Sequence, residues 1–365
     1  MEAKKRARTS RANRRRWPGQ GAWLVTGGCG FIGANFVRLV RRLRPERPLV
    51  VLDKLTYAGN LANLDGLFDD GLVKFVRGCI ADRKKVKKVL ELGVEAIVNF
   101  AAESHVDRSI EDAGAFLATN ITGTQVLLDE ARALSRPGTR GIRFLQVSTD
   151  EVYGSLEPPH SATPDSNLHC SSPYSASKAA ADLLVQAARH THGSDVLLTR
   201  CTNNYGPYQF PEKMIPLMIT NALEDRPLPV YGDGQQVRDW VHVDDHCRGL
   251  LAALEHGQAG RIYHFGGAEE RTNLDMVTRI LELVGKPRTL IQYVADRKGH
   301  DRRYSLDTSA TRAELGWKPE VELTAGLAET VRWYRDGAAW WGPIKSGEYR
   351  HYYDRTYGRR AEVPA

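Results

Sequence analysis

The chain has 365 residues, of which 42% are hydrophobic and 26% are charged, a composition typical of a folded globular protein. Its formal net charge is +7, but residues 1–16 contain eight Lys and Arg and a single Glu, so the remaining 349 residues are formally neutral. The basic balance therefore does not indicate a nucleic-acid-binding face on the folded part. No apolar run approaches the roughly 18 residues of a membrane span, so we expect neither a membrane helix nor a signal peptide.

We expect residues 1–20 to be a disordered basic leader, and the alternative for it is tethering to nucleic acid or to a membrane. The five cysteines are widely scattered, odd in number and without a Cys-x-x-Cys pair. This usage indicates a reducing cytoplasm and predicts neither a disulfide framework nor a metal site. His190 and His192, near a predicted helix end, are expected to be solvated rather than metal-bound.

A glycine-rich turn joins the first predicted strand, residues 22–26, to a helix that ends near residue 43. Its glycines fit Gly-x-Gly-x-x-Gly at positions 28, 30 and 33 and Gly-x-x-Gly-x-x-Gly at Gly27, Gly30 and Gly33. A β-carbon there would keep a pyrophosphate away from the backbone amides at the helix start. A second apolar strand, residues 49–52, ends in Asp53, whose carboxylate can bind a ribose 2′-hydroxyl and would repel a 2′-phosphate. The pattern favours NAD over NADP, and the alternative is a turn that only connects strand to helix.

Strands and helices alternate up to about residue 200. Further apolar strands are predicted at residues 73–76, 96–100, 143–147 and 196–200, and helices at 84–90, 113–134 and 174–190. This alternation predicts an α/β fold with a doubly wound, Rossmann-type parallel sheet and right-handed crossovers. Asn120, inside the second of these helices, is expected to be buried and hydrogen-bonded across the core.

Beyond residue 200 the alternation loosens, which predicts a smaller carboxyl-terminal α/β lobe. Strands are expected at 228–231, 238–243 and 261–265, and helices at 211–223, 245–256 (capped by Asp244), 273–284 and 324–334. We expect a leader at 1–20, an NAD-binding domain at 21–200 to which part of 235–265 returns, a second lobe at 201–336 and an aromatic tail at 337–365. The tail, with Trp340, Trp341, Tyr352 and Tyr353, is expected to pack on the body of the protein or on a second subunit.

Polar side chains are expected to converge where the strand at 143–147 ends. Thr149, Asp150 and Glu151 follow this strand, and open α/β sheets bind ligands at the carboxyl ends of their strands. Tyr174 and Lys178 stand four residues apart at the start of the next helix, so they project from one face. Each residue alone has a structural explanation as a turn cap or a surface group, but the combination after a dinucleotide turn predicts a catalytic site.

The densest charge cluster of the body, residues 296–303, lies in the part that should overhang the sheet. Lys213, Arg238, Arg297 and Arg303 together favour a second phosphate site there, because planar guanidinium groups suit a diphosphate. The alternative is a solvated charged surface.

The chain from about residue 21 to residue 334 resembles the extended short-chain dehydrogenases/reductases, and among them most closely the dTDP-glucose 4,6-dehydratase family. The glycine turn and Tyr-x-x-x-Lys assign only the superfamily, which also contains epimerases, decarboxylases and reductases of nucleotide sugars. The run from Thr149 to Glu151 discriminates, since epimerase relatives generally carry small or hydroxyl residues in place of the two acids. Further matches to the family lie at 53–60, 101–109, 203–208 and 296–300.

The resemblance implies a lyase of deoxysugar biosynthesis, such as rhamnose biosynthesis, that converts dTDP-glucose to the 4-keto-6-deoxy sugar. Tyr174, its phenol pKa lowered by Lys178, is expected to take the O4 proton while C4 passes a hydride to NAD. Thr149 is expected to donate a hydrogen bond to the new carbonyl. Glu151 is then the base at C5 and Asp150 the acid at the C6 hydroxyl, before the hydride returns to C6. NAD is regenerated each turn, so it should stay bound, and a homodimer is also implied.

The resemblance also implies two groups of binding residues. NAD contacts are expected from Gly27, Gly30, Phe31, Ile32, Gly33, Asp53, Lys54, Leu55, Thr56, Ala101, Ala102, Thr119, Tyr174, Lys178 and Asn204. Contacts to the nucleotide sugar are expected from Ser104, Thr149, Asn203, Lys213, Met214, Pro229, Val230, Tyr231, Arg238, Asn273, Arg297 and His300, with the arginines on the diphosphate. The lobe at 201–336 is therefore expected to bind mainly the nucleotide sugar.

The chain departs from the family at Cys79, where Asp is usual and an adenine contact is expected, at Lys298, where Pro is frequent, and in its basic leader. These differences bear on cofactor affinity more than on reaction type. Two alternatives have the same fold: a dehydratase of UDP-hexose or another NDP-hexose, and a 4-epimerase. A third is a catalytically silent NAD-binding scaffold whose leader binds nucleic acid. The leading hypothesis expects no metal, membrane or nucleic-acid partner.

Overall fold

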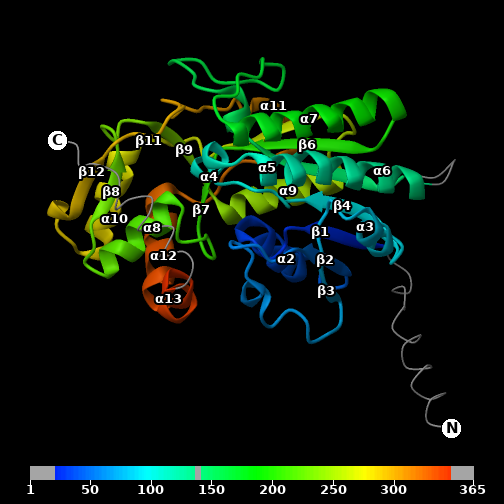
Figure 1. Ribbon diagram of the computed structural model, residues 1–365, viewed down its shortest axis with the longest axis horizontal. Coiled ribbons are helices and arrows are strands. Elements are labelled where there is room, and N and C mark those ends of the chain that lie inside the picture. Colours follow the sequence, from blue (N-terminus) through cyan, green and yellow to red (C-terminus); the bar gives the residue numbers. More distant parts are fainter. Residues whose placement is uncertain (1–20, 136–140, 347–365) are drawn as a thin grey trace, which may run out of the picture.

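A seven-stranded parallel sheet forms the centre of the larger of two units (Figure 1). The computed structural model describes residues 21–135 and 141–346. The strand order is β10-β6-β5-β4-β1-β2-β3, in which β1 lies between β2 and β4, and this is the order of a doubly wound, Rossmann-type sheet. The predicted fold class is confirmed. The strands are β1 (Ala22–Thr26), β2 (Leu49–Asp53), β3 (Val73–Arg77), β4 (Val94–Asn99), β5 (Arg143–Thr149), β6 (Val196–Cys201) and β10 (Ile262–Phe265).

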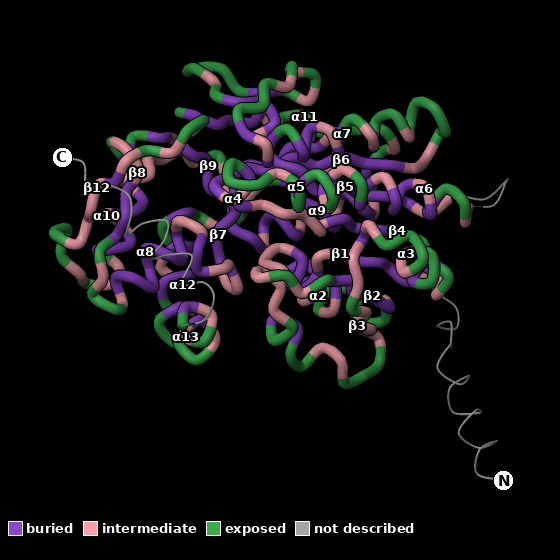
Figure 2. The backbone as a smooth tube through the Cα atoms, in the orientation of Figure 1, coloured by how far each residue is buried: buried purple, intermediate pink, exposed green. Residues whose placement is uncertain are grey.

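Helices cover both faces of this sheet, and successive residues of a strand enter different cores. Leu49 and Val51 of β2 pack into the core beside α2 and α9, whereas Val50 and Leu52 pack into the core beside α3, α6 and α7. Figure 2 shows the buried strands between helices whose outer faces are exposed. The helices of this unit are α2 (Phe31–Leu43), α3 (Arg83–Leu90), α4 (Val106–Glu111), α5 (Gly114–Phe116), α6 (Thr124–Leu134), α7 (Pro173–His192), α9 (Val243–His256) and α11 (Ser309–Leu315), with the 3₁₀ turns η1 (Leu61–Leu64) and η3 (Asp150–Tyr153).

The helix predicted at 113–134 is interrupted by a π-helical segment, η2 (Leu117–Gly123), between α5 and α6. Asn120 lies in this segment and is 2% exposed. Its side-chain amide accepts the backbone N–H of Glu103 at 2.9 Å and donates to the carbonyl of Glu103 at 3.0 Å and to Ser177 Oγ at 2.8 Å. The prediction that Asn120 is buried and hydrogen-bonded is confirmed, and the bonds tie the loop after β4 to α7.

The predicted cap of α9 is wrong by two residues. The helix begins at Val243, and its N-cap is His242, whose Nδ1 accepts the backbone N–H of Asp244 at 3.3 Å. Asp244 therefore lies in the first turn, where its charge favours the positive end of the helix.

The smaller unit contains two short sheets, one with the order β11-β9-β7 and one of β12 and β8, around its own apolar core. In Figure 1 this unit stands at the left, beyond the carboxyl ends of the parallel strands. Its elements are β7 (Asn203–Tyr205), α8 (Met214–Leu223), β8 (Leu228–Tyr231), β9 (Val237–His242), β11 (Glu270–Thr272), α10 (Asn273–Val284), η4 (Arg288–Leu290), β12 (Ile291–Val294), α12 (Leu323–Asp336) and α13 (Ala338–Ser346).

The helix α13 packs on the body of the protein. Trp341 is 7% exposed, and Trp340 Nε1 donates to Asn63 Oδ1 at 2.9 Å. Asn63 in turn donates its side-chain N–H to the carbonyl of Cys29, in the glycine-rich turn, at 2.9 Å. The predicted leader and the aromatic residues 352 and 353 lie outside the described residues.

In residues 21–135 and 141–346, no helix combines the length and the apolarity that crossing a bilayer requires. Within the same ranges, no group of three or more His, Cys, Asp or Glu side chains is arranged to hold a metal ion.

Candidate active site

Two cavities meet between the units. A cleft of about 320 Å³ runs along the carboxyl ends of the parallel strands, and a second cavity of about 180 Å³ extends from it into the smaller unit. The residues that line both are Ser104, Glu151, Asn203, Glu212 and Lys213. A ligand in the first cleft therefore lies next to a ligand in the second.

The larger cleft brings together all but one of the residues predicted to bind NAD. Lining it are Gly27, Gly30, Phe31, Ile32, Gly33, Asp53, Lys54, Thr56, Ala101, Ala102, Thr119, Tyr174, Lys178 and Asn204. The structure does not place Leu55 on this cleft, because its side chain packs against the hydrophobic core beside α2. Leu55 has φ +56°, and its backbone N–H donates to Asp53 Oδ1 at 2.8 Å.

The glycine turn has the shape that a dinucleotide needs. Gly27 has φ +64°, and a β-carbon there would lie 2.7 Å from the backbone nitrogen of Ala101, so a side chain cannot be accommodated. Asp53 Oδ2 accepts the backbone N–H of Cys29 at 2.9 Å, which ties the end of β2 to the turn. Burial raises the pKa of Asp53, while its backbone hydrogen bonds act in the opposite direction. The residues of this cleft fit NAD: a tight turn at a helix start with a carboxylate beside it.

The two predicted acids follow Thr149, the last residue of β5. Thr149 caps the short turn η3, in which Asp150 and Glu151 are the first residues. The Thr149 hydroxyl donates to Asp150 Oδ1 at 3.1 Å and accepts the backbone N–H of Glu151 at 3.3 Å. Asp150 is 3% exposed, and its Oδ2 is a buried atom without a protein hydrogen-bond partner in the described structure. Glu151 lines both cavities.

The surroundings of Asp150 and Glu151 affect the pKa values of the two carboxyl groups differently. Burial, and then the nearby charge of Glu151, raise the pKa of Asp150 well above its ordinary value. Burial also raises the pKa of Glu151, but the cations Arg297, Lys213 and Arg238 oppose this shift. Asp150 is therefore suited to give a proton and Glu151 to take one.

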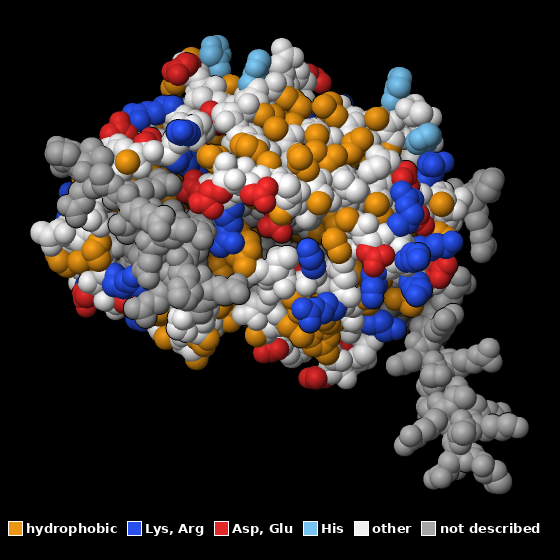
Figure 3. All heavy atoms as spheres, in the orientation of Figure 1, with side chains coloured by type: hydrophobic (Ala, Val, Ile, Leu, Met, Phe, Trp, Pro, Cys, Tyr) orange, Lys and Arg blue, Asp and Glu red, His pale blue; other side chains and the backbone are white. Residues whose placement is uncertain are grey.

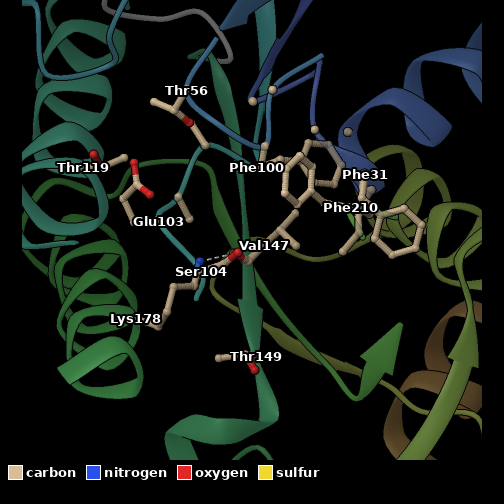
Figure 4. A pocket seen from close by; sticks show the side chains of 18 of the residues that line it. Phe31, Thr56, Phe100, Glu103, Ser104, Thr119, Val147, Thr149, Lys178 and Phe210 are labelled. Carbon is tan, nitrogen blue, oxygen red and sulfur yellow. Dashed lines mark hydrogen bonds between the residues drawn. The ribbon is translucent and has the colours of Figure 1, made fainter. Parts of the chain in front are cut away.

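Tyr174 and Lys178 line the larger cleft, as the i, i+4 spacing predicts, but the expected pKa effect is wrong. Burial raises the pKa of the Tyr174 phenol well above its ordinary value, and Glu151 raises it further. The Lys178 ammonium donates to the carbonyl of Val147 at 2.7 Å, a bond drawn in Figure 4. Burial lowers the pKa of Lys178, so its charge is held by neighbours rather than by solvent.

The smaller cavity contains the residues predicted to contact the nucleotide sugar, apart from Thr149, which lies in the larger cleft. These are Ser104, Asn203, Lys213, Met214, Pro229, Val230, Tyr231, Arg238, Asn273, Arg297 and His300. Arg238 stacks on Tyr304, with its guanidinium carbon 4.2 Å from the ring centroid. Arg297 lies 3.8 Å from Asp107, and its buried Nε has no protein hydrogen-bond partner in the described structure. This cavity therefore offers the cationic side chains of Lys213, Arg238 and Arg297, and a free donor on Arg297, to an anion.

Of the four basic residues predicted for the phosphate site, Arg303 lies outside both cavities and Lys213 lies where the two cavities meet. Arg303 does not line either cavity, because its guanidinium is paired with Glu270 at 2.6 Å and donates to the carbonyl of His160 at 2.7 Å. Its assignment to the phosphate site is wrong. Lys213 reaches the junction of the cavities, where it donates to the carbonyl of Ser104 at 2.8 Å.

Several lining residues were missed from the sequence. Figure 4 shows the rings of Phe31, Phe100 and Phe210 gathered on one side of the larger cleft, with Glu103 and Thr119 on the other. Of these five residues, only Phe31 and Thr119 were predicted to line the NAD cleft. Phe100 ends the predicted strand before Ala101, so its position at a strand end was a usable signal. Other missed residues include the buried Glu212, which lines both cavities, and the aromatic Tyr304 of the smaller cavity.

Comparisons with known proteins show the family of the chain. The family model described as GDP-mannose 4,6 dehydratase matches residues 24–330. A dTDP-glucose 4,6-dehydratase from Streptomyces niveus is 52% identical, over 88% of this chain and 95% of its own. The structure of a dTDP-glucose 4,6-dehydratase from Streptomyces venezuelae with NAD bound is 52% identical, has a TM-score of 0.84 and covers 89% of this chain and 100% of its own. A UDP-glucose 4-epimerase from Thermotoga maritima with UDP-glucose is 28% identical, with a TM-score of 0.79 and coverage of 87% and 99%.

The sheet order, the glycine turn with its carboxylate and the Tyr174–Lys178 pair define a short-chain dehydrogenase/reductase of the extended type. Asp150 and Glu151 stand in the same cleft as this pair, and Glu151 also lines the second cavity. The chain belongs to the dTDP-glucose 4,6-dehydratase family.

Proposed function

We propose that this protein converts dTDP-glucose to dTDP-4-keto-6-deoxyglucose and water, with NAD as its bound cofactor. One observation carries the proposal: Glu151 stands at the junction of the dinucleotide cleft and the cavity that contains Arg238 and Arg297, directly after a buried Asp150 whose pKa is raised well above its usual value. Elimination of water needs one group that takes a proton and another that gives one, and this pair supplies both.

NAD, when bound, supplies the acceptor that holds a hydride taken from the sugar until it is returned. The chain's own residues would bind and orient it: Asp53 would hold the ribose hydroxyls, and the amides of the glycine turn would hold the pyrophosphate. Lys178 and Tyr174 line the same cleft as the two acids, and Lys178 would hold the nicotinamide ribose.

Each proton transfer has a named group. Tyr174 takes the O4 proton as its phenolate, which the raised pKa makes strongly basic, and its oxygen lies within reach of Thr149. Thr149 can then donate to the C4 carbonyl oxygen. Glu151 takes the C5 proton and Asp150 protonates the departing C6 hydroxyl. Glu151 returns its proton to C5 when the hydride reaches C6, and the O4 proton held by Tyr174 restores the acid form of Asp150 through Thr149, whose hydroxyl lies 3.1 Å from Asp150 Oδ1. In the second cavity Arg238, Arg297 and Lys213 neutralise the diphosphate.

The alternatives have less support. A 4-epimerase has the same fold, as the Thermotoga maritima enzyme illustrates, but it has no use for a buried acid beside a base. A silent NAD-binding scaffold does not need Thr149, Asp150, Glu151, Tyr174 and Lys178 gathered at one cleft. Its proposed nucleic-acid-binding leader lies outside the described residues.

The proposal is tested by mixing the purified protein with dTDP-glucose, without added NAD, and measuring the 4-keto product by its absorbance in alkali. We expect the chromophore to form, and to form more slowly from UDP-glucose. Faster reaction with UDP-glucose would assign a uridine substrate. Conversion of the sugar with no chromophore would indicate an epimerase.

A homodimer is part of the proposal. Apolar side chains gather on the surface over α5, η2 and α7 (Figure 3). Leu117 of η2 and Leu183 of α7 are 49% and 56% exposed, and Ile110 of the neighbouring α4 is 41% exposed. Such a patch on a folded protein marks an interaction site. We place the enzyme in the cytoplasm, which its five free cysteines support, and in deoxysugar biosynthesis, which consumes a 4-keto-6-deoxy sugar.

A further inference from the structure

Three side chains outside the predicted catalytic and binding groups form a compact cluster beside the cavities: Tyr57, Arg108 and Glu212. The Tyr57 hydroxyl donates to Glu212 Oε1 at 2.8 Å. Arg108 donates to Glu212 Oε2 at 3.5 Å, and its guanidinium carbon lies 3.8 Å from the centroid of the Tyr57 ring. Each member therefore contacts both of the others.

The members of this cluster come from three segments that border the larger cleft. Tyr57 belongs to the loop that continues from Asp53, Arg108 to α4 after β4, and Glu212 to the loop that enters α8 from the smaller unit. The ring of Phe210, which lines the cleft, meets the ring of Tyr57 edge-on with centroids 5.5 Å apart. The cluster thus joins one unit to the other across the cofactor cleft.

Burial strengthens the hydrogen bonds and the ion pair within this cluster. The Glu212 side chain is 1% exposed, and a carboxylate in that position is stable only while its partners stay in place. Burial raises the pKa of Glu212, and the cations Lys213 and Arg108 oppose the shift. Burial and the charge of Glu212 both raise the pKa of Tyr57, so its hydroxyl remains a donor. Loss of one partner leaves the others poorly satisfied, so the cluster opens as a unit.

The cluster also borders the second cavity. Glu212 lines both cavities, and the adjacent Lys213 holds the carbonyl of Ser104, which lines both as well. A closed cluster therefore keeps the loop at 210–213 against the cleft and at the junction with the sugar site.

We infer that Tyr57, Arg108 and Glu212 form a latch that retains NAD by fastening the loop of the smaller unit over the cofactor cleft. These are positioning residues, and the inference rests on the proposed function, in which NAD is regenerated and need not leave. The latch is absent from the predicted binding residues, and its contacts are all within the protein.

The test measures NAD dissociation without sugar. Protein loaded with NAD is diluted into a trap that consumes free NAD, and the NAD still bound is assayed at intervals after denaturation. Tyr57→Phe keeps the ring but removes the donor, and Glu212→Met keeps the side-chain length but removes both acceptors. We expect NAD to leave about tenfold faster from each variant, since a hydrogen bond to a charged group is lost. Tyr57→Phe in the Glu212→Met background should add no further loss.

The matched control is Tyr293→Phe, on β12, which lines neither cavity and should release NAD at the wild-type rate. Unfolding midpoints of all variants separate loosening of the latch from general destabilisation. Wild-type release from Tyr57→Phe, or additive effects in the double variant, would overturn the inference. Wild-type protein that retains NAD but makes no 4-keto product would contradict the proposed function alone, and one that never binds NAD would contradict both.

Discussion

Asp182 Oδ2 lies 2.9 Å from Nε of Arg200, and the two side chains are 0% and 1% exposed. Asp182 follows Lys178 by one turn of α7, so the pair lies directly behind the ammonium that faces the cleft. Arg200 also donates to the hydroxyl of Tyr153, which is bonded to Nε2 of His264 at 2.7 Å. A buried charge network thus connects the predicted catalytic lysine to the edge strand β10.

Removing one partner of this pair should strongly destabilise the fold. We expect Arg200→Leu to lower the free energy of unfolding by about 3–5 kcal/mol, because Asp182 is left as an uncompensated buried charge. The measurement is chemical denaturation, with Arg189→Leu on the exposed end of α7 as the control. The double variant Asp182→Leu/Arg200→Leu should recover part of the loss. A loss below about 1 kcal/mol for Arg200→Leu would contradict the prediction.

Replacing the proposed base should stop the reaction after its first half. We expect Glu151→Gln to reduce turnover by about 10²–10⁴-fold, because the amide cannot take the C5 proton. Oxidation at C4 does not need this group, so the absorbance of reduced nicotinamide should rise when dTDP-glucose is added. Glu157→Gln, at an exposed position in the next loop, is the control and should leave both signals unchanged. Normal turnover of Glu151→Gln would show that another residue is the base.

The raised pKa of Asp150 should make stability depend on pH. An ordinary Asp loses its proton near the value of 3.8, but Asp150 keeps its proton to a much higher pH in the folded protein. Between these two values the folded state binds more protons than the unfolded state, so its stability contribution falls as pH rises. Asp150→Asn removes this pH-dependent contribution. We therefore expect the free energy of unfolding of the variant to rise relative to that of the wild type as pH increases from ~4 to ~8. Parallel denaturation curves at both pH values would argue against a protonated Asp150.

Cys79 lines the cofactor cleft, at a position where the resemblance described above implies an Asp that contacts the adenine. An acid there can accept a hydrogen bond from the adenine amino group, whereas a thiol is a weak acceptor. We expect Cys79→Asp to tighten NAD binding by about tenfold, the effect of one hydrogen bond to a charged group. Equilibrium titration of cofactor-depleted protein measures it, and Cys170→Asp, at an exposed site outside both cavities, is the control. Unchanged affinity would mean that residue 79 does not contact the adenine.

The apolar patch over α5, η2 and α7 should hold the proposed homodimer together. We expect Leu183→Asp to shift the protein to a monomer in sedimentation experiments, because a charge is placed in an apolar contact. Leu61→Asp, at another exposed leucine away from the patch, is the matched control and should not change the mass. A monomeric wild type would contradict the proposal.

Sequence periodicity located the parallel sheet because buried strands are short apolar runs between glycine turns. The predicted strand at 49–52 and the predicted helix at 273–284 match β2 and α10 closely. The interruption at η2 was not predicted, since a π-helical turn changes the backbone without changing the apolar pattern around Asn120. The cap of α9 was misplaced because a histidine, His242, takes the position usually held by Asp, Ser or Thr.

At the site, the four-residue spacing correctly predicted that Tyr174 and Lys178 lie together at the cleft. The predicted direction of the Tyr174 pKa shift was wrong. That shift depends on how deeply the phenol is buried and on the charge of Glu151, and neither can be read from local spacing. Arg303 was misassigned because its partner, Glu270, is distant in the sequence. Glu212 was missed for the same reason, since Tyr57 is 155 residues away and only folding brings them together.

The bond between Trp340 and Asn63, 277 residues apart, also bears on how the protein is made. Asn63 supports the turn at Cys29, so the packing around that turn is completed only after Trp340 has left the ribosome. The edge strand β10 likewise joins the sheet late in synthesis. A nascent chain can collapse around β1 to β4 early, yet the support of its glycine-rich turn is completed only by a residue of α13.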